Sequence, residues 1–514
     1  MGVLYVKTGG SLSGTYSTPD DWTGANCHPN IATALGKPWV DGDEIVCFDQ
    51  ALNQASILTS TYAGSGTAIT VRSASNDPAL ATINLTSATA NGIGHSKPFN
   101  LTFKGFTINK TVTHTGTAAA IAAINGGITA SIIFDTCIIQ NVTVDASSGN
   151  GVFSSIYPNV GTLRFVDTII QDVDVTYPGG IWFANCSNTT TVEIVRSTIQ
   201  RVANTSTGDN DSLGGIYAGN IVLEDSVIDD VMSVNNTTTG SLHYGFFYST
   251  NAAAAFSGSN NRLRNMHVTG GQASAAIFTT GPYSWQSLHF NNVKAFASVG
   301  SNSIGGCFAA SGNNAQGSGV GIYARSCESD YGTVLYTSQG AGGTFREAYS
   351  RGNRARSSAV FYAGGWGDQT LEDFASIGDE AAFNPQYVSD HGIIYGHVNI
   401  AAPRAPTRVY RSGLIHSPRL PSDKAVIVAR NATPGYPNNV VIDDVQIVAT
   451  TNRQIQVVES ASCEVNISGN YKSSNGALVE SRSGTGVSNI VRLSPTGRTV
   501  IGVSRGLEAT RVAA

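Results

Sequence analysis

Charged residues are scarce in this chain. Asp, Glu, Lys and Arg together make up 13% of its 514 residues, and the formal net charge is -5. A balance this close to neutral gives no basic surface of the kind used to bind nucleic acid, so we expect no nucleic-acid partner. The surface must instead be covered largely by Ser, Thr, Asn and Gln. Such a surface is typical of a rigid extracellular or particle-borne protein that meets carbohydrate.

Segments that would direct the chain to a membrane or to secretion are also missing. Residues 1–10 run straight into a strand-like segment, without a basic start or an apolar core. The apolar stretch 118–124 is far too short to span a bilayer. Seven scattered cysteines show no Cys-x-x-Cys spacing. We interpret them as reduced core or turn residues, in agreement with synthesis in a reducing cytoplasm, and expect no membrane insertion.

Motifs for metal, cofactor or nucleophile chemistry are lacking. The nine histidines occur singly, without His-x-His or His-Glu-x-x-His spacing. There is no Gly-x-Ser-x-Gly elbow in a strand, turn and helix setting, and no phosphate-cradling loop that ends in Gly-Lys-Ser/Thr. The sequence therefore predicts neither a metal site nor a cofactor.

What the sequence does contain is a repeat of about thirty residues. One element of the repeat is an apolar segment with a polar turn near its middle. A second element is a Gly followed by apolar or aromatic residues, as at Gly151, Gly215 and Gly306. Two short strands per repeat, separated by Gly, Asn, Ser and Thr, predict one coil of a parallel β-helix. The clearest copies of the first element are residues 132–142, 163–173, 192–202 and 221–231.

Alignment of these copies gives columns with a physical meaning. Inward positions alternate along each strand and meet the same position one coil away, at about 4.8 Å. Stacked aliphatic side chains of this kind fill a core that no single coil could bury. A column of small residues fits an inward corner. The columns are Ile132, Leu163, Val192, Ile221; Phe134, Phe165, Ile194, Leu223; Ile139, Ile170, Ile199, Ile228; Cys137, Thr168, Ser197, Ser226; and Val142, Val173, Val202, Val231.

We therefore predict an all-β, right-handed parallel β-helix of about a dozen coils with an N-terminal cap. Residues 1–95 would hold the cap and the first coils, with a short helix at residues 31–35 and a turn and strand at residues 40–48. Residues 96–484 would form the β-helix. Residues 485–514 leave the pattern and would form a C-terminal cap or a subunit-contact segment.

The Gly-linked strand does not alternate, because the residue before each aromatic is apolar too. A strand with water on one face should alternate, so both faces of this one are predicted to be covered. Packing of three subunits around an axis, aromatic platforms for sugar rings and an inserted loop are the three explanations. The predicted column is Phe153, Trp182, Tyr217, Phe247, Phe278, Phe308, Leu335, Phe361 and Ile394.

These features carry a resemblance. The opening residues 5–10, the Asp-Gly-Asp-Glu-Ile-Val entry at 41–46 and the Phe-x-x-Cys-x-Ile-x-x-Val coils resemble the pectate-lyase-like superfamily of right-handed β-helices. Within it the chain is most similar to bacteriophage tailspike and tail-fibre proteins. The resemblance implies a homotrimer that binds surface polysaccharide, and many such proteins cleave it. The chain shows neither a separate N-terminal particle-binding domain nor a long C-terminal trimerisation domain.

Two columns of alternating charge lie on successive coils. Opposite charges stacked at about 5 Å favour a structural ladder, because like charges there would repel. A column of glutamines beside them predicts an amide ladder that stabilises the turns. The members are Asp167, Arg196, Asp225; Asp172, Arg201, Asp230; and Gln140, Gln171, Gln200.

Carboxylates near irregular insertions are the catalytic candidates. Asp209 and Asp211 lie in one insertion, and Asp379, Glu380 and Asp390 flank another. Glycoside hydrolysis needs two carboxylates that face each other across a bond. Solvated loop acids are the plainer interpretation. A lyase would need a base and a cation, which arginines within residues 345–357 could supply, although exposed turn arginines explain them as well.

Aromatic residues and arginines are the glycan-binding candidates. An aromatic face offers apolar contact to a sugar ring while neighbouring polar groups bond its hydroxyls. Turn positions next to Gly or Pro would let such side chains point outward, with a packing role as the alternative. The candidates are Tyr283, Trp285, Trp366, Arg351 and Arg354.

The function predicted from the sequence is that of a phage tailspike-like or fibre-like virion protein. It would be synthesised in the host cytoplasm and exposed on the particle, in contact with other virion proteins and with host-surface polysaccharide. Whether it degrades that polysaccharide stays open. A free polysaccharide lyase or glycoside hydrolase is the first alternative, and a purely structural particle spike is the second.

Overall fold

The structure is a computed structural model of the 514-residue chain. It describes residues 2–14, 22–59, 64–125, 127–146, 151–155, 160–177, 182–206, 212–235, 242–251, 255–270, 275–296, 305–381, 392–398, 404–420, 424–431, 437–449, 455–459, 463–469, 472–473, 479–483, 489–495 and 507–511.

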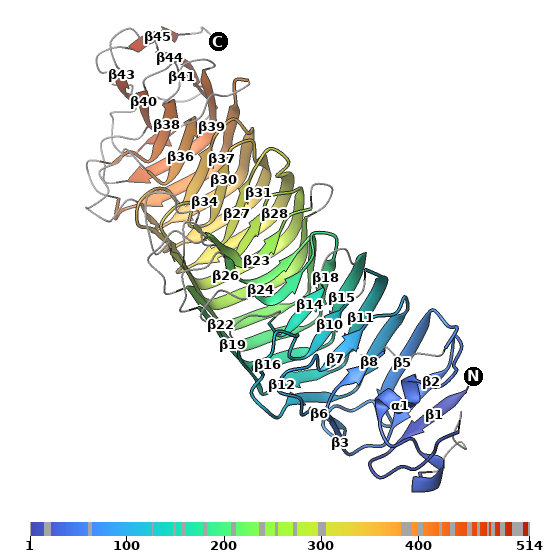
Figure 1. The fold of residues 1–514 in the computed structure, drawn as a ribbon. Helices are drawn as coiled ribbons and strands as arrows, with labels where there is room; N and C mark the ends of the chain where they lie inside the picture. Colours follow the sequence, from blue (N-terminus) through green and yellow to red (C-terminus); the bar gives the residue numbers. More distant parts are fainter. Residues whose placement is uncertain are drawn as a thin grey trace. The chain divides into compact units, whose positions relative to one another are not determined.

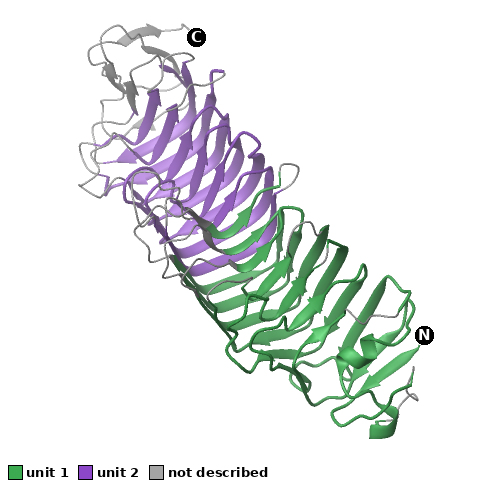
Figure 2. Cartoon of the chain, viewed as in Figure 1, with its two compact units in different colours: residues 1–251 green, residues 252–514 purple. Residues whose placement is uncertain are grey.

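The chain forms two compact units, residues 1–251 (unit 1) and residues 252–514 (unit 2), which Figure 2 shows in different colours. In each unit the strands of successive coils pair in parallel, one coil after another (Figure 1). A continuous parallel ladder in which every coil repeats the same path is a solenoid. The predicted all-β parallel β-helix is therefore confirmed.

In unit 1 a longer series of strands forms one sheet and a series of short strands forms another. The first comprises β1 Val3–Val6, β2 Glu44–Cys47, β3 Ala51–Gln54, β5 Ala68–Ser73, β6 Thr82–Leu85, β8 Asn100–Lys104, β9 Thr107–Lys110, β11 Thr129–Asp135, β12 Ile138–Gln140, β13 Val142–Asp145, β15 Val160–Val166, β16 Ile169–Tyr177, β18 Thr191–Val195, β19 Thr198–Ser206, β21 Asn220–Glu224 and β22 Val227–Asn235. The second comprises β4 Ile57–Leu58, β7 Ile93–His95, β10 Ala122–Ile124, β14 Phe153–Ser155, β17 Trp182–Cys186, β20 Ser212–Ala218 and β23 Leu242–Ser249.

Unit 2 has the same two series. The first comprises β24 Phe256–Thr269, β26 Tyr283–Phe296, β28 Gln316–Arg325, β29 Glu328–Ser329, β31 Gly342–Arg351, β32 Arg354–Ala355, β34 Gln369–Ile377, β35 Glu380–Ala381, β37 Thr407–Ser417, β39 Asn438–Ala449, β41 Cys463–Gly469, β42 Lys472–Ser473, β44 Asn489–Pro495 and β45 Leu507–Arg511. The second comprises β25 Ile277–Thr279, β27 Phe308–Ser311, β30 Leu335–Ser338, β33 Phe361–Gly364, β36 Ile394–Val398, β38 Ile427–Asn431, β40 Ile455–Glu459 and β43 Val479–Ser483.

Many coils turn at two corners where a residue adopts a positive φ. In the coil of β11 to β13 these are Thr136 (φ 53°) and Asn141 (φ 57°). A single left-handed residue redirects the chain without ending its pairing with the neighbouring coils. The columns of alternating charge occupy these same corners, since Asp167, Arg196 and Asp225 all have φ between 47° and 49°.

The inward columns form as the sequence predicted. Ile132 pairs with Leu163 in β15, and Phe134 stacks on Phe165 with ring centroids 5.5 Å apart. Ile139 pairs with Ile170. All six side chains are 2% exposed or less. Burial of such side chains contributes about 1.5–3 kcal/mol each, which makes these columns the main source of stability in unit 1.

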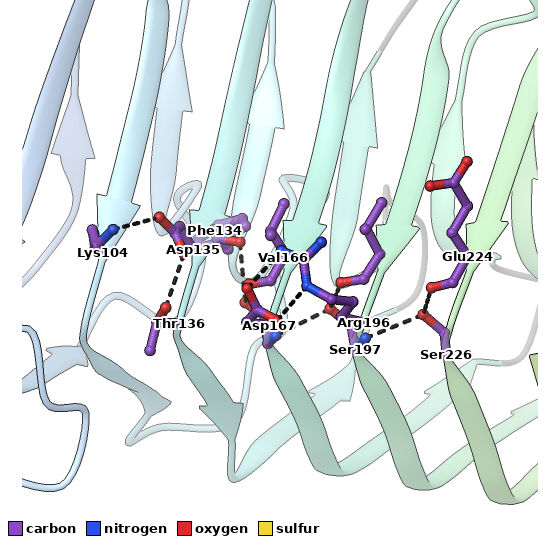
Figure 3. Close-up of polar contacts among 12 residues, drawn as sticks. Lys104, Phe134, Asp135, Thr136, Val166, Asp167, Arg196, Ser197, Glu224 and Ser226 are labelled. Atoms are coloured by element: carbon purple, nitrogen blue, oxygen red, sulfur yellow. Dashed lines mark hydrogen bonds and ion pairs between the residues drawn. The ribbon is translucent and has the colours of Figure 1, made fainter.

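The column of small residues forms a hydroxyl ladder at the inward corner (Figure 3). The hydroxyl of Thr168 accepts a hydrogen bond from the backbone N–H of Cys137, at 3.3 Å. Ser197 Oγ accepts from the N–H of Thr168, and Ser226 Oγ from that of Ser197, at 3.0 and 3.1 Å. Each coil thus satisfies a corner amide of the previous one.

The N-terminal region contains the predicted helix. α1, Ile31–Leu35, begins after Asn30, whose side chain accepts a hydrogen bond from the N–H of Thr33 at 2.7 Å. Its buried residues pack against β1, β2 and β4, while a 3-10 turn, η1, occupies Gly24–Asn26. The predicted strand within 40–48 is β2. No helix in the described part of the chain is long and apolar enough to cross a membrane.

The Gly-linked strand differs in register from the prediction in unit 1. Phe153 pairs with Ala184 rather than with Trp182, which pairs with Gly214. The segments that lead into these strands vary in length, so the position of the preceding Gly does not fix the pairing. In unit 2 the predicted column is confirmed from Phe308 through Leu335, Phe361 and Ile394, whereas Phe278 pairs with Ala309.

Both faces of this strand are covered within a single chain. On one face Phe308 packs on Trp285, with centroids 4.3 Å apart. The next residues point to the other face, where Tyr336 and Tyr362 stack at 4.7 Å and are 9% and 6% exposed. This burial requires no partner subunit, and the homotrimer stays a prediction. All seven cysteines are buried with free thiols.

Candidate functional site

The charged columns of unit 1 are structural ladders, as predicted, and Figure 3 shows the column of Asp167 and Arg196. The guanidinium of Arg196 donates two hydrogen bonds to Asp167, at 2.8 and 2.7 Å. Arg201 binds Asp172 in the same way, at 2.6 and 3.0 Å. The hydrogen bonds from each Arg hold the pKa of its Asp partner below its usual value. These ion pairs are about half exposed, so solvent screens them and each contributes little to the stability of the fold.

The glutamine column forms the predicted amide ladder. Gln171 Nε2 donates to Gln140 Oε1, and Gln200 Nε2 donates to Gln171 Oε1, both at 2.8 Å. Asparagines form the same kind of amide hydrogen bond in the earlier coils, where Asn84 donates to Asn53 at 2.9 Å. The hydrogen bonds within these ladders explain Asp167, Asp172, Arg196, Arg201 and the glutamines as structural residues.

Most of the predicted catalytic carboxylates do not form a site. Asp209, Asp211 and Asp390 lie outside the described residues. Asp379 is fully buried, so the interpretation of it as a solvated loop acid is wrong. Glu380 forms an ion pair with Arg354 at 3.0 Å.

Asp379 is buried because it belongs to an inward corner of unit 2. Its carboxylate accepts hydrogen bonds from Ser350 Oγ at 2.6 Å, from Ser376 Oγ at 2.5 Å and from the N–H of Asn353 at 2.7 Å. Loss of hydration outweighs these bonds and raises the pKa of Asp379 to about 6. Its surroundings make it a buried structural acid.

Two of the predicted aromatic platforms are wrong. Tyr283 and Trp285 are 4% and 5% exposed, because they occupy inward positions of β26 rather than a turn. Gly319 in the next coil makes room for the indole, since a Cβ there would lie 1.9 Å from the ring. Trp366 does lie in a turn, after β33, and is half-buried beside Gly340.

Most arginines of residues 345–357 are engaged in ion pairs. Arg346 binds Glu372 at 3.0 Å, and Arg354 binds Glu380. Arg356 binds Glu328 at 2.9 Å and lies over the ring of Phe296 at 3.6 Å. Arg351 differs from them, because no ion pair involves it within the described part of unit 2.

An aromatic ladder, which the sequence reasoning missed, lies beside Arg351. The rings of His289 and Tyr323 stack with centroids 4.5 Å apart and planes 12° apart. Tyr323 stacks on Tyr349 at 5.3 Å and 15°. The three residues occupy one outward position of β26, β28 and β31, so the parallel register places one ring on each coil. Tyr349, at the end of this aromatic ladder, is 43% exposed.

A column of arginines runs next to the aromatic ladder. Arg325 and Arg351 follow Tyr323 and Tyr349 by two residues on the same strands, so they lie on the same outward face. Like Arg351, Arg325 is exposed and has no carboxylate partner among the described residues. Aromatic and arginine columns line a groove of about 350 Å³ together with Ala375 and Ile377.

A second groove of about 590 Å³ opens on the other side of Tyr349. Its lining includes Asp373, Ser412 and Asp444, which have φ of 52–53° and occupy successive copies of one corner. The two carboxylates are therefore two coils apart, about 10 Å. Gln446 and Leu414 also line this groove.

Burial tunes the titrating groups of the aromatic ladder. Burial, and then the charge of Arg262, lowers the pKa of His289, whose Nε2 lies 2.9 Å from Ser287 Oγ. Burial, and then the charge of Glu347, raises the pKa of Tyr323. Both shifts favour the uncharged form at neutral pH, which leaves the arginines as the cations of this face.

A sequence signal for this face existed. Tyr-x-Arg occurs at residues 323–325 and at residues 349–351, each with a small or apolar inward residue before the Tyr and another between the Tyr and the Arg. An outward Tyr and Arg on an alternating strand is the pattern of a polar face, and its recurrence one coil later predicts stacked columns. The candidates predicted from the sequence were aromatic residues in turns, so this pair of strand positions was not among them. Among the described residues, no group of three or more His, Cys, Asp or Glu could hold a metal ion.

Comparisons with known proteins identify no family for this chain. No family model matches the sequence, and no curated protein matches it. Among solved structures, the chain is similar to that of the PL6 family alginate lyase AlyGC, with a TM-score of 0.19 and 9% identity over 99% of both chains. A likeness of this degree carries no argument about activity.

Proposed function

We propose that this chain is a polysaccharide-binding β-helix of the phage tailspike or fibre type, which engages the surface glycan of the host. The observation that supports the proposal is the aromatic ladder of unit 2 with Arg325 and Arg351 beside it, neither of which has a carboxylate partner among the residues that the structure describes. Aromatic rings offer apolar contact to sugar rings, and guanidinium groups donate several hydrogen bonds in a fixed geometry.

The rigidity of the platform also favours this function. A binding surface on paired strands is ordered before the ligand arrives, so little conformational entropy is lost on binding. Each of the three coils of the aromatic ladder presents one ring and one polar group, at intervals of about 4.8 Å, which is comparable to the length of one sugar residue in an extended chain. A linear polysaccharide can therefore meet the same groups repeatedly.

Titration of the full chain with purified bacterial capsular and lipopolysaccharide glycans tests the proposal. We expect saturable binding to at least one glycan. Replacement of both Tyr323 and Tyr349 by Ala should weaken it about tenfold or more, because two ring contacts are lost. The matched control is Met232→Ala, which removes an exposed apolar side chain of unit 1. Binding that survives the double change, or that no glycan shows, would contradict the proposal.

Hydrolysis of the bound glycan is the second candidate function. Asp373 and Asp444 line one groove at a separation of about two coils, close to the spacing that inverting glycosidases use. We expect new reducing ends on prolonged incubation, and their loss in Asp373→Asn and in Asp444→Asn with binding retained. Binding without new reducing ends would identify an adhesin instead.

A further inference from the structure

The aromatic ladder of unit 2 stops at a gap that has the dimensions of one more ring. Tyr349 pairs with Ala375 in β34, and Ala375 pairs with Leu414 in β37. Tyr323 covers one face of the Tyr349 ring, and the small side chain of Ala375 lies opposite the other face. We call the space above Ala375, between Tyr349 and Leu414, the slot.

The size of the slot follows from the register. Two coils separate Tyr349 from Leu414, which is about 10 Å. The rings of the aromatic ladder are 5.3 Å apart at Tyr323 and Tyr349. A flat ring placed above Ala375 would therefore continue the aromatic ladder at its own spacing. Tyr349 and Leu414 are 43% and 38% exposed, so the walls of the slot are open to solvent.

The two open sides of the slot differ in charge. Asp373 and Ser412 lie on one side, at the left-handed corner. Arg351 and Ile377 lie on the other side, two residues further along their strands. Both grooves described above include Tyr349 and Ala375, so they meet at the slot.

We propose that the slot binds one anionic sugar ring, stacked on Tyr349 in place of the missing ladder ring. Its carboxylate or sulfate would pair with Arg351, and hydroxyls on the opposite edge of the ring would donate to Asp373. A guanidinium without a carboxylate partner is suited to a charge-assisted, bidentate pair with such a group. This inference rests on the proposed polysaccharide-binding function and names the ligand class of that site.

Filling the slot gives the sharpest test. Ala375→Tyr would extend the aromatic ladder by one ring, so the fold is expected to stay intact while the ligand is excluded. Thr198→Tyr is the matched control, since Thr198 follows the corner residue Arg196 by two residues, as Ala375 follows Asp373. Isothermal titration would use an oligogalacturonate, a sulfated heparin oligosaccharide and a neutral cello-oligosaccharide of equal length.

We expect the anionic probe that matches the site to bind about tenfold or more tightly than the neutral one. Ala375→Tyr should abolish this binding, and Thr198→Tyr should leave it unchanged. Arg351→Gln should remove the preference for the anionic probe and retain weak binding of both. If Ala375→Tyr lowers the melting temperature, Tyr349→Ala replaces it, with a loss of about tenfold expected.

The outcomes separate this inference from the proposed function. Anionic binding that Ala375→Tyr and Tyr349→Ala leave unchanged would overturn the slot and keep the polysaccharide-binding function. Equal binding of the neutral and anionic probes would overturn the anionic ligand class. If no glycan, native or model, binds the unaltered chain, the proposed function itself fails.

Discussion

At the scale of single residues, one device recurs at the inward corners. In several coils a side chain accepts a hydrogen bond from the backbone N–H of the corner residue one coil before it. In unit 1 the acceptors are hydroxyls, as with Ser197 and Thr168. In unit 2, Asn353 Oδ1 accepts from the N–H of Cys327, and Asp379 accepts from the N–H of Asn353, both at 2.7 Å. An unsatisfied buried amide would cost about 1–3 kcal/mol, so the device explains polar residues in an apolar column.

Asp379 makes this device sensitive to pH. Its pKa is about 6 in the folded chain against 3.8 in the unfolded chain. Between these values the unfolded state releases a proton that the folded state keeps. The stabilisation is therefore fully present below pH 4, falls by roughly 3 kcal/mol as the pH rises to about 6, and then stays constant.

Asp379→Asn should remove this dependence, since an amide does not titrate and still accepts from the N–H of Asn353. We expect the free energy of unfolding of the unaltered chain, relative to the variant, to fall between pH 4 and pH 6. Urea unfolding followed by tryptophan fluorescence at several pH values measures the difference. Parallel pH profiles of the two proteins would show that Asp379 does not titrate in this range.

At the scale of strands, the sequence predicted the core better than the surface. The columns of Phe134 and Ile139 were predictable because apolar residues alternate and recur at a nearly constant spacing. The opposed charges of Asp167 and Arg196 predicted an ion pair for the same reason. Period and chemical type are both local properties, so they can be read without a structure.

The register of the Gly-linked strand, the burial of the aromatic residues and the slot depend on contacts between residues far apart in the sequence. The register of the Gly-linked strand is set by core packing, not by the distance from a Gly, so Trp182 was assigned to the wrong column. The burial of Trp285 depends on Gly319 in the next coil. The slot requires three strands to be aligned at once, because its defining residue, Ala375, is notable only beside Tyr349 and Leu414.

At the scale of the whole molecule, a local defect in a solenoid is expected to destabilise only the nearby coils. Each coil pairs with its immediate neighbours, so the stability of the fold is close to a sum of coil and neighbour contributions. A defect in one coil of unit 1 should therefore loosen the adjacent coils first. The slot is built entirely from unit 2, so glycan binding at the slot is a separate measure of whether a defect in unit 1 affects unit 2.

Ile170→Asp tests how many coils a local defect destabilises. Ile170 is 1% exposed and pairs with Ile139 and Ile199, so an aspartate there would bury an unpaired charge and cost several kcal/mol. Ile169→Asp is the matched control, because Ile169 is 36% exposed and its change should have little effect. Hydrogen exchange resolved by peptide should show lost protection in β12, β16 and β19 for Ile170→Asp alone.

In the same variant, β31, β34 and β37 should keep their protection, and glycan binding at the slot should be unchanged. The reason is that none of the strands that form the slot pairs with the altered coil. Equal loss of protection in both units would mean that the chain unfolds as one cooperative body. In that case the additive description of the solenoid would fail, and distant substitutions could no longer serve as neutral controls for the slot.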